Sequence, residues 1–217
     1  MARSVVQRTL VLGSTQPTEL VAPEAMRART VELVRRRGGG GAVYLEPGNH
    51  LWLDAWIPRE DPLWRHDVSV AAEWVGQWWV EGLGGLGIGP GSKSEFGARA
   101  FSIHAGRSVP GRRGELVCFA GRGPGEVFDG DRKLVGLSQW RSREGALFSS
   151  CAYSSWDPDP LLDLFEIDDA SREELALELR GVAVGLGPLA PPEVDLSMVQ
   201  ERMIGSFPGF AVEADGA

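Results

Sequence analysis

Lysine is so rare in this sequence that each one invites a chemical explanation. Only Lys93 and Lys133 are lysines among the 22 basic residues. Arginine can replace lysine on most solvated surfaces, but not where a compact ammonium must fit a tight space. A lysine beside a bound carbonyl or phosphate would stabilise the negative charge that develops there. Lys133 is therefore a candidate site residue, and an exposed lysine at a strand end is the alternative. Gly136, three residues on, is typical of a place where a ligand approaches a strand.

A glycine run is the second feature that could bind a ligand. Arg36 and Arg37 are followed by four consecutive glycines, Gly38, Gly39, Gly40 and Gly41. Such a run lets the backbone adopt positive φ and approach a ligand closely, and its N–H groups can hold an anion. The arginines could add bidentate contacts. No Gly-Lys-Ser/Thr follows, so this is not a P-loop. We expect Gly39 and Gly40 to need positive φ or close ligand approach, and a solvated surface loop is the alternative.

The elements that would position these residues are strands first and helices last. Strands are expected over residues 8–12, 30–34, 42–45, 51–57, 99–104 and 116–120, and a hairpin over 133–141 and 146–153. A tight turn is expected at Asp129-Gly130, just before the first strand of this hairpin. Helices are expected over 23–29, 68–83 with Asp67 as N-cap, 161–165, 172–186 and 194–204. This order predicts an α+β fold.

Charge divides the chain into two parts. Residues 157–217 hold 14 acidic and 3 basic residues, whereas residues 1–156 are mildly basic and the whole chain has a net charge of −8. We expect residues 1–156 to form the core of one domain and residues 157–217 to be an acidic helical segment packed on it. The acidic balance argues against nucleic-acid binding.

Targeting signals and a disulfide framework are not indicated. No apolar run approaches the roughly 18 residues of a membrane helix, so we expect no membrane association. The N-terminal residues have no signal-peptide core. Two cysteines are too few for a disulfide framework, and Cys151 lies in an apolar run typical of a core. These features predict a cytoplasmic protein with reduced thiols.

Four motifs together resemble the lipoate–protein ligase family, which is related to biotin protein ligases and octanoyl transferases. Gly13 with Gln16, residues 36–43, Gly48-Asn49, and residues 132–136 with Gln139 occur in the order and spacing of that family. The resemblance runs from about residue 8 to residue 153. It implies a mixed, largely antiparallel sheet flanked by helices, as in biotin and lipoate protein ligases.

The resemblance also implies an activity and partners. Family members attach lipoyl or octanoyl groups, through an amide, to a lysine on a lipoyl carrier domain of a 2-oxoacid dehydrogenase or glycine-cleavage protein. Lipoate or octanoate, free or carrier-bound, is the acyl source. The ligases first form an acyl-adenylate from ATP with Mg²⁺. Lys133 would sit by the acyl carbonyl. The residues that would bind acyl group or adenylate are Arg36, Arg37, Gly38, Gly39, Gly40, Gly41, Ala42, Gly48, Asn49 and Gly136.

Departures from the family pattern concern the metal and the nucleotide. Residues 44–47 are Tyr-Leu-Glu-Pro, where ligases commonly have Phe-His-Asp before the Gly-Asn. Residues 121–126 replace the Asn-Asp that helps hold the metal in ligases, and Glu126 alone could serve there as a hard oxygen ligand. The family usually has an N-terminal helix before the first strand, and the first eight residues leave no room for it.

Cys118 points to a different mechanism. Residues 116–120 are similar to the segment that carries the nucleophilic cysteine in one class of octanoyl transferase. A thiolate there would take the acyl group as a thioester and pass it to an amine, and a nearby ammonium would favour the thiolate. A buried, inert cysteine is the alternative.

Three hypotheses follow. A lipoate–protein ligase acting through an acyl-adenylate is favoured by the glycine run and by Gly48-Asn49. An octanoyl transferase with a Cys118 thioester, needing no cofactor, is favoured by Cys118 and by the departures at Leu45 and Gly123-Pro124. The third is a non-catalytic subunit that binds lipoate or an adenylate and needs a partner chain.

Overall fold

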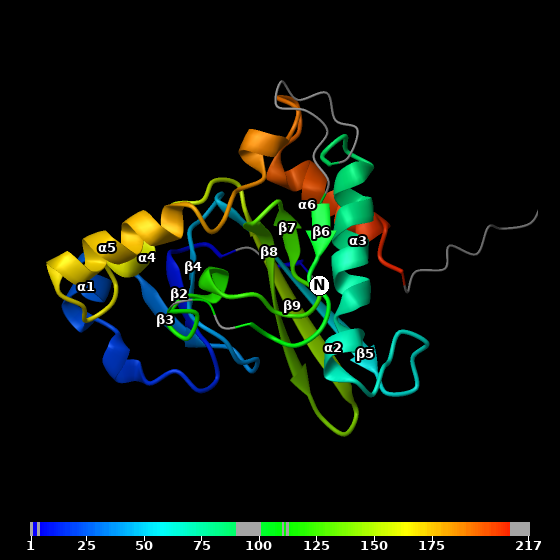
Figure 1. Cartoon of the computed structure of the whole chain (residues 1–217), viewed down its shortest axis with the longest axis horizontal. Helices are drawn as coiled ribbons and strands as arrows, with labels where there is room; N and C mark the ends of the chain where they lie inside the picture. Colours follow the sequence, from blue (N-terminus) through cyan, green and yellow to red (C-terminus); the bar gives the residue numbers. More distant parts are fainter. Residues whose placement is uncertain (1, 4, 90–100, 110, 112, 209–217) are drawn as a thin grey trace, which may run out of the picture.

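The computed structural model describes residues 2–3, 5–89, 101–109, 111 and 113–208, and within them the strands form two sheets (Figure 1). The larger sheet is antiparallel and has the order β1-β5-β9-β8-β7-β6. Its strands are β1 (Ala2–Arg3), β5 (His50–Pro58), β9 (Gly145–Tyr153), β8 (Arg132–Arg141), β7 (Val127–Asp129) and β6 (Phe101–Ile103). The smaller sheet has the order β3-β2-β4, with β2 parallel to β3 and antiparallel to β4. Its strands are β2 (Thr9–Leu12), β3 (Glu32–Arg35) and β4 (Val43–Leu45).

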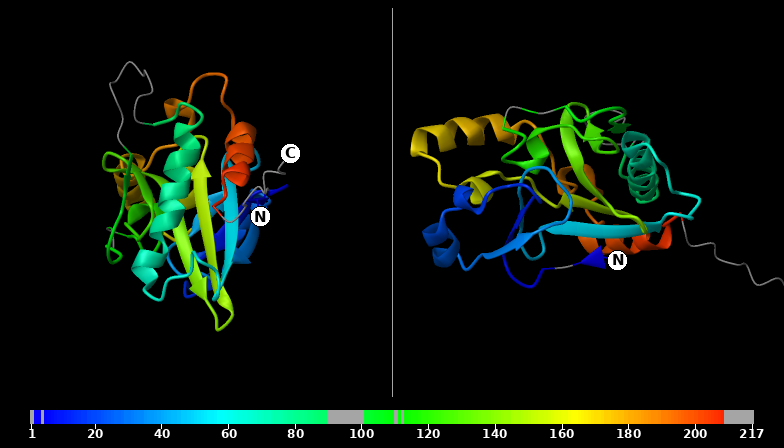
Figure 2. Two further views of the ribbon diagram at one scale, coloured as in Figure 1. Left: turned by 90° about the vertical axis from the view of Figure 1, so that its right-hand side faces the viewer. Right: turned by 90° about the horizontal axis from the view of Figure 1, so that it is seen from below.

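Helices cover the large sheet on one face and the small sheet lies toward the other (Figure 2). The α-helices are α1 (Pro23–Ala28), α2 (Val68–Ala71), α3 (Glu73–Gly84), α4 (Asp159–Leu162), α5 (Asp169–Arg180) and α6 (Leu196–Gly205). Short 3₁₀ helices are η1 (Thr18–Leu20), η2 (Cys118–Ala120) and η3 (Gly187–Leu189). No helix in the described part of the chain is long and apolar enough to cross a membrane.

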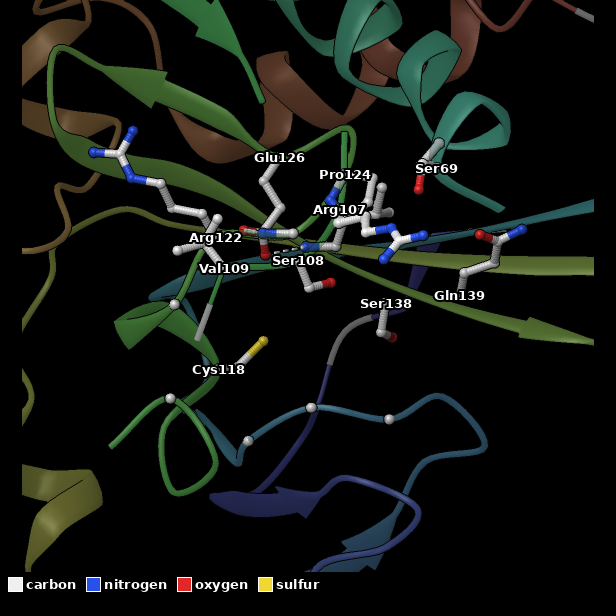
Figure 3. A pocket seen from close by; sticks show the side chains of 18 of the residues that line it. Ser69, Arg107, Ser108, Val109, Cys118, Arg122, Pro124, Glu126, Ser138 and Gln139 are labelled. Atoms are coloured by element: carbon white, nitrogen blue, oxygen red, sulfur yellow. Dashed lines mark hydrogen bonds between the residues drawn. The ribbon is translucent and has the colours of Figure 1, made fainter. Parts of the chain in front are cut away.

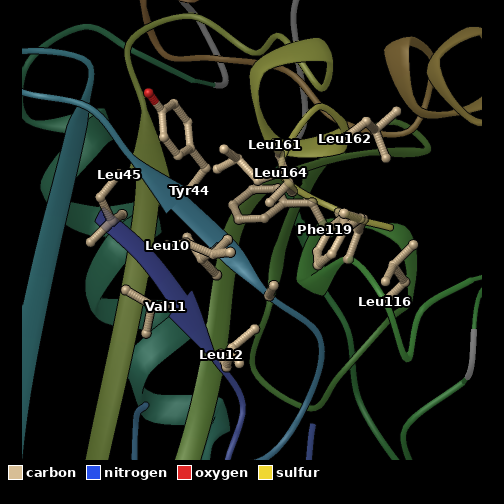
Figure 4. Close-up of a cluster of buried hydrophobic side chains, with 14 of the residues drawn as sticks. Leu10, Val11, Leu12, Tyr44, Leu45, Leu116, Phe119, Leu161, Leu162 and Leu164 are labelled. Atoms are coloured by element: carbon tan, nitrogen blue, oxygen red, sulfur yellow. The ribbon is translucent and has the colours of Figure 1, made fainter. Parts of the chain in front are cut away.

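The alternation of β9 shows how the large sheet separates two cores. Phe148 and Ala152 point into the core with α3 and α6, while Cys151 and Tyr153 point into the core with the small sheet. Successive side chains of a strand face opposite sides, so one strand can serve both cores. Figure 4 shows the core with the small sheet, where side chains of β2 and β4 meet Phe119 and the leucines of α4 and of the turn that follows it.

Residues 157–208 take part in both cores. Leu175 and Leu179 of α5 belong to the core with the small sheet, and Val199 and Met203 of α6 belong to the other. Between these helices the backbone of residues 182–184 runs beside the start of β8. The N–H of Lys133 donates to Val182 O at 2.8 Å, and the N–H of Val184 donates to Lys133 O at 3.0 Å. The C-terminal segment therefore covers the strand that carries Lys133.

The structure confirms the α+β class, with antiparallel strands flanked by helices, and the hairpin of β8 and β9. Asp67 is an N-cap, since its carboxylate accepts bonds from the N–H groups of Ser69 and Val70. The helix expected over residues 68–83 is divided at Ala72. The turn before β7 packs against this break, where a Cβ on Gly125 would lie 2.1 Å from Ala72 O.

The strand expected over residues 116–120 was wrong. These residues form a turn that ends in η2, and within the described part of the chain their one strand-like pairing is an isolated bridge between Val117 and Ala42. Leu116, Val117 and Phe119 are buried, and a short buried apolar run does not by itself distinguish a strand from a buried turn. Of the strand expected over 99–104, residues 101–103 are β6 and residues 99–100 lie outside the described part.

Candidate active site

Lys133 is a buried cation, which makes the alternative of an exposed lysine wrong. Its side chain is 1% exposed. The Nζ atom lies 2.8 Å from Glu126 Oε2 and donates a hydrogen bond of 2.8 Å to the backbone carbonyl of Cys118. A lysine ammonium has three donors, so these two partners leave one N–H of Lys133 available. A register shift between Val127 and Phe128 accompanies this inward placement of Lys133.

Glu126 holds the ammonium from a tightly bonded position. Its Oε2 also accepts from the N–H of Gly123 at 2.6 Å, and its Oε1 accepts from the N–H of Leu137 at 3.2 Å. Burial raises the pKa of Glu126, and the Lys133 charge and the two backbone bonds act against that rise. Both carboxylate oxygens thus have partners. Among the described residues no three His, Cys, Asp or Glu side chains cluster as metal ligands do. The donor set does not fit a preformed magnesium site.

Cys118 joins Lys133 at the same place from another segment. Its backbone N–H donates to Ala42 O at 3.0 Å, and the N–H of Ala42 donates to Leu116 O at 2.8 Å. These bonds attach η2 to the end of the glycine run. The side chain of Cys118 is partly exposed and points toward the middle of a pocket (Figure 3). Cys151 differs, since it is 3% exposed and burial raises its pKa.

The glycine run is shaped by close packing at some positions and not at others. Gly40 has a φ of +93°, as expected, whereas Gly39 does not adopt positive φ and a Cβ there would meet nothing within 4 Å. Positive φ is therefore excluded for Gly39, and close approach of a ligand there stays a prediction. A Cβ on Gly41 would lie 2.6 Å from Val117 C. Gly41 thus allows the run to lie directly against the segment that carries Cys118.

The two arginines before the run have different roles. Arg36 folds back on it, and its Nη2 donates to Gly39 O at 2.7 Å and to Gly41 O at 2.8 Å. Its Nε and Nη1 are buried with no hydrogen-bond partner among the described residues. Arg37 is exposed and its guanidinium carbon lies 4.7 Å from the ring centre of Trp140.

A pocket of about 580 Å³ brings six of the thirteen predicted site residues together. Of those, Gly39, Gly40, Gly41, Cys118, Glu126 and Lys133 line it. Arg36 and Gly136 line an adjoining void of about 10 Å³ that Cys118 shares. Phe119 also lines that void and lies close to Gly136, since a Cβ on Gly136 would lie 3.0 Å from the Phe119 ring. Gly38 and Ala42 do not line the pocket: Gly38 packs against Ser138, which does, and Ala42 is buried in the core.

Gly48 and Asn49 are not part of this pocket. Gly48 has a φ of +78° in the turn between β4 and β5. Asn49 Oδ1 accepts from the N–H of Ser155 at 2.9 Å, and Asn49 Nδ2 donates to Ser155 O at 3.2 Å. Asn49 lines a separate pocket of about 130 Å³ with Tyr44, Glu46 and Trp156. The two pockets share no lining residue.

Some lining residues were not anticipated from the sequence. Arg107 and Ser108 come from the loop after β6, Arg122 from the loop before β7, and Ser69 from α2. Arg122 pairs with Asp131 at 2.9 Å, whereas the Arg107 guanidinium has no partner among the described residues. Because arginine makes up 20 of the 22 basic residues, the sequence alone does not distinguish an arginine at the pocket from one on the surface.

Three solved structures that share this fold are described as lipoate protein ligases. A bi-partite lipoate protein ligase from Thermoplasma acidophilum, described with its E2 lipoyl domain, aligns with a TM-score of 0.65 at 19% identity, covering 93% of this chain and 66% of that one. A lipoate-protein ligase A bound with ATP aligns with a TM-score of 0.60 at 18% identity, covering 93% and 68%. A candidate lipoate protein ligase from T. acidophilum with bound lipoic acid aligns with a TM-score of 0.61 at 17% identity, again covering 93% and 68%.

The likeness to these structures shows the fold, and this chain spans about two thirds of their length. No curated protein sequence matches this chain. The family described as the lipoyl protein ligase A/B catalytic domain matches residues 4–208. Because that match covers nearly the whole sequence, the chain belongs to the lipoyl protein ligase A/B catalytic domain family.

Proposed function

We propose that this protein transfers a lipoyl or octanoyl group to a lysine of a lipoyl carrier domain, by way of a thioester on Cys118. One observation carries the choice of mechanism: the ammonium of Lys133 is bonded to the backbone carbonyl of Cys118 itself, on the wall of the pocket that the Cys118 side chain faces. A cation fixed to the nucleophile's own residue is suited to an acyl-transfer site. Membership of the family supports lipoylation in general.

The first step would load the enzyme. The sulfur of Cys118 attacks the carbonyl carbon of an acyl thioester, and a new carbon–sulfur bond forms as the bond to the donor thiol breaks. The proton that leaves Cys118 ends on the departing thiol, so no oxidant or nucleotide is consumed. The remaining N–H of Lys133 is positioned by Glu126 and Cys118 O, and it would donate to the oxygen that becomes negative during the attack.

The second step would release the acyl group to the acceptor. The amine of the carrier lysine attacks the Cys118 thioester, an amide bond forms, and the bond to Cys118 breaks. The amine's proton ends on the Cys118 sulfur, which restores the free thiol. The open pocket of about 580 Å³ leaves room for an incoming amine beside the acyl group.

An ATP-dependent ligase is the second candidate, because a structure with the same fold is described as bound with ATP. In that case the adenylate would replace the thioester, and Lys133 would lie beside its carbonyl or phosphate. Magnesium would require Glu126 to exchange its present partners or would rely on the nucleotide's own oxygens.

The two candidates are distinguished by which acyl source the purified chain accepts. An apo lipoyl domain is incubated with the protein and either octanoyl carrier protein alone or lipoate with ATP and Mg²⁺, and the acceptor's mass is measured. We expect acylation with the carrier-bound octanoyl group in the absence of ATP. Acylation only with lipoate, ATP and Mg²⁺ would establish the ligase. No acylation in either reaction would favour the non-catalytic subunit.

A further inference from the structure

Two tryptophans with a leucine between them form a row across the end of the large sheet. In the strand register Trp56 of β5 and Trp140 of β8 are both paired with Leu147 of β9, so all three side chains share one face. The two indole rings lean toward each other, with their centres 6.3 Å apart. Trp56 is 43% exposed, and Leu147 and Trp140 are partly buried. We refer to Trp56, Leu147 and Trp140 as the tryptophan row.

The tryptophan row is continuous with the edge of the active-site pocket. Arg37 stacks on Trp140 at 4.7 Å and directly precedes the glycine run. A Cβ on Gly38 would lie 2.8 Å from Ser138 Oγ, so the run lies against β8 two residues before Trp140. Ser138 and Gln139 line the pocket. A molecule that covers the pocket mouth from this side would therefore also contact the tryptophan row.

The same mouth carries three arginines, one of which, Arg122, is paired with Asp131. Arg107 and Arg122 line it and Arg37 flanks it, whereas among the described lining residues Glu115 is the one exposed carboxylate. Glu126, the other acidic lining residue, is buried and paired with Lys133. Oppositely charged surfaces steer and orient protein partners, and tryptophan and arginine are the residues that contribute most to binding energy at interfaces.

We propose that the tryptophan row and Arg37 form the docking surface for the acceptor, an acidic protein domain that presents its target lysine to Cys118. The proposal rests on the proposed function, since it assumes that a protein lysine enters this pocket. A lysine side chain can reach a buried thioester only if the protein that carries it covers the pocket mouth. The indole rings of Trp56 and Trp140 next to that mouth supply apolar contact, and the nearby arginines favour a negatively charged partner.

The test separates docking from chemistry. The first half-reaction is followed with a small octanoyl thioester that has no protein carrier, as octanoyl mass gained by the enzyme. The second is followed as transfer to increasing concentrations of apo lipoyl domain. In Trp56→Ala and in Trp140→Ala we expect the KM for the lipoyl domain to rise about tenfold, while self-acylation stays within about twofold of the original chain. Trp56→Phe should recover most of the affinity.

Matched controls and a second readout make the outcome decisive. Leu177→Ala removes an apolar side chain that is 74% exposed on α5, away from the pocket, and should leave the KM unchanged. Raising the ionic strength should weaken the acceptor's binding in the original chain, because exposed charges are screened. An unchanged KM in both tryptophan variants would overturn the proposal. So would a parallel loss of self-acylation, or a concentration-dependent dimer that dissociates in Trp56→Ala, which would assign the row to a second copy.

A failure of the proposed function would be distinguishable from a failure of the docking surface. If the original chain forms no acyl adduct, binding of the apo lipoyl domain is measured directly by calorimetry on the same variants. Weaker binding in Trp56→Ala than in Leu177→Ala would keep the docking surface. Equal binding in both, or no binding by the original chain, would overturn it.

Discussion

The pocket around Lys133 and the turn at Gly48–Asn49 are regions that the family resemblance ties to one ligand, yet they are built differently. Around Lys133 a buried ammonium joins two separate segments through Cys118 O and Glu126, each at 2.8 Å. At the turn, the side-chain bonds of Asn49 all go to Ser155 and close a connection between strands. The first arrangement holds a buried ammonium next to the Cys118 segment, and the second fixes a loop.

This difference bears on the mechanism. The residues at the Lys133 pocket are those that a thioester transferase would use, whereas Gly48-Asn49 is a motif that favoured the ligase from the sequence. If the protein is not an ATP-dependent ligase, substitutions at the Gly48–Asn49 turn should affect folding, and substitutions at the Lys133 pocket should affect turnover. Both regions can be changed one residue at a time.

Lys133→Arg should have the largest effect. The larger guanidinium cannot keep the contacts of a compact ammonium, so turnover should fall by a factor on the order of 100 or more. The position is 1% exposed, so the free energy of unfolding should also fall, by about 1–3 kcal/mol for an overpacked site. Rates are therefore measured on protein whose circular dichroism shows it folded. Unchanged turnover in a folded sample would remove Lys133 from the site.

Gly41→Ala and Gly39→Ala test how the glycine run is held against Cys118. A Cβ on Gly41 would lie within 2.7 Å of the Cys118 backbone nitrogen, whereas a Cβ on Gly39 would meet nothing within 4 Å. Displacing Cys118, the proposed nucleophile, should lower turnover in Gly41→Ala about tenfold or more, while Gly39→Ala should stay close to the original rate. Equal losses in the two variants would mean that the ligand contacts Gly39 and that the close packing at Gly41 is incidental.

Asn49→Ala tests the second region, the turn at Gly48–Asn49. Loss of its hydrogen bonds with Ser155 should lower the free energy of unfolding by about 1–2 kcal/mol, as for other partly exposed hydrogen bonds. Turnover at a temperature where the variant is folded should change by less than about twofold. A loss of turnover far beyond this, with ATP as a substrate, would return Asn49 to the active site and support the ligase.

The smallest effect should be a pH dependence of stability at His50. Burial lowers the pKa of His50 below its ordinary 6.5, against a smaller opposite effect of the Glu46 carbonyl. As pH falls below about 6.5, the unfolded chain binds a proton that the folded chain resists, so stability is lost toward the lower folded pKa. His50→Asn cannot titrate and should lose less stability between pH 7.5 and about pH 5.5 in urea unfolding. Parallel pH curves for the two proteins would contradict this.

Local sequence signals predicted the parts of the fold that depend on neighbouring residues. Asp129-Gly130 marked the turn before β8, and Asp67 marked the start of α2, because both depend on backbone chemistry within a few residues. The apolar run at 116–120 failed because burial, not pairing, explains its composition. Whether a short apolar segment pairs is decided by the rest of the fold.

The site was predictable in residue type and not in arrangement. Rarity singled out Lys133, but its pairing with Glu126 depends on the register shift between β7 and β8 and on the turn at Gly125 packed against Ala72. Arg107 and the tryptophan row carried no distinguishing pattern, since their positions at the pocket mouth follow from loops and strand register.

The identity of the acyl intermediate decides between transfer through Cys118 and an ATP-dependent ligase. The purified chain is incubated with a small octanoyl thioester without ATP, and its intact mass is measured before and after hydroxylamine, which cleaves thioesters and leaves amides. We expect one octanoyl group on the peptide that contains Cys118, removed by hydroxylamine, absent in Cys118→Ser and retained in Cys151→Ala, whose native thiol is buried and has a raised pKa. Full ATP-dependent lipoylation by Cys118→Ser, with no adduct on the original chain, would exclude the Cys118 thioester as the intermediate.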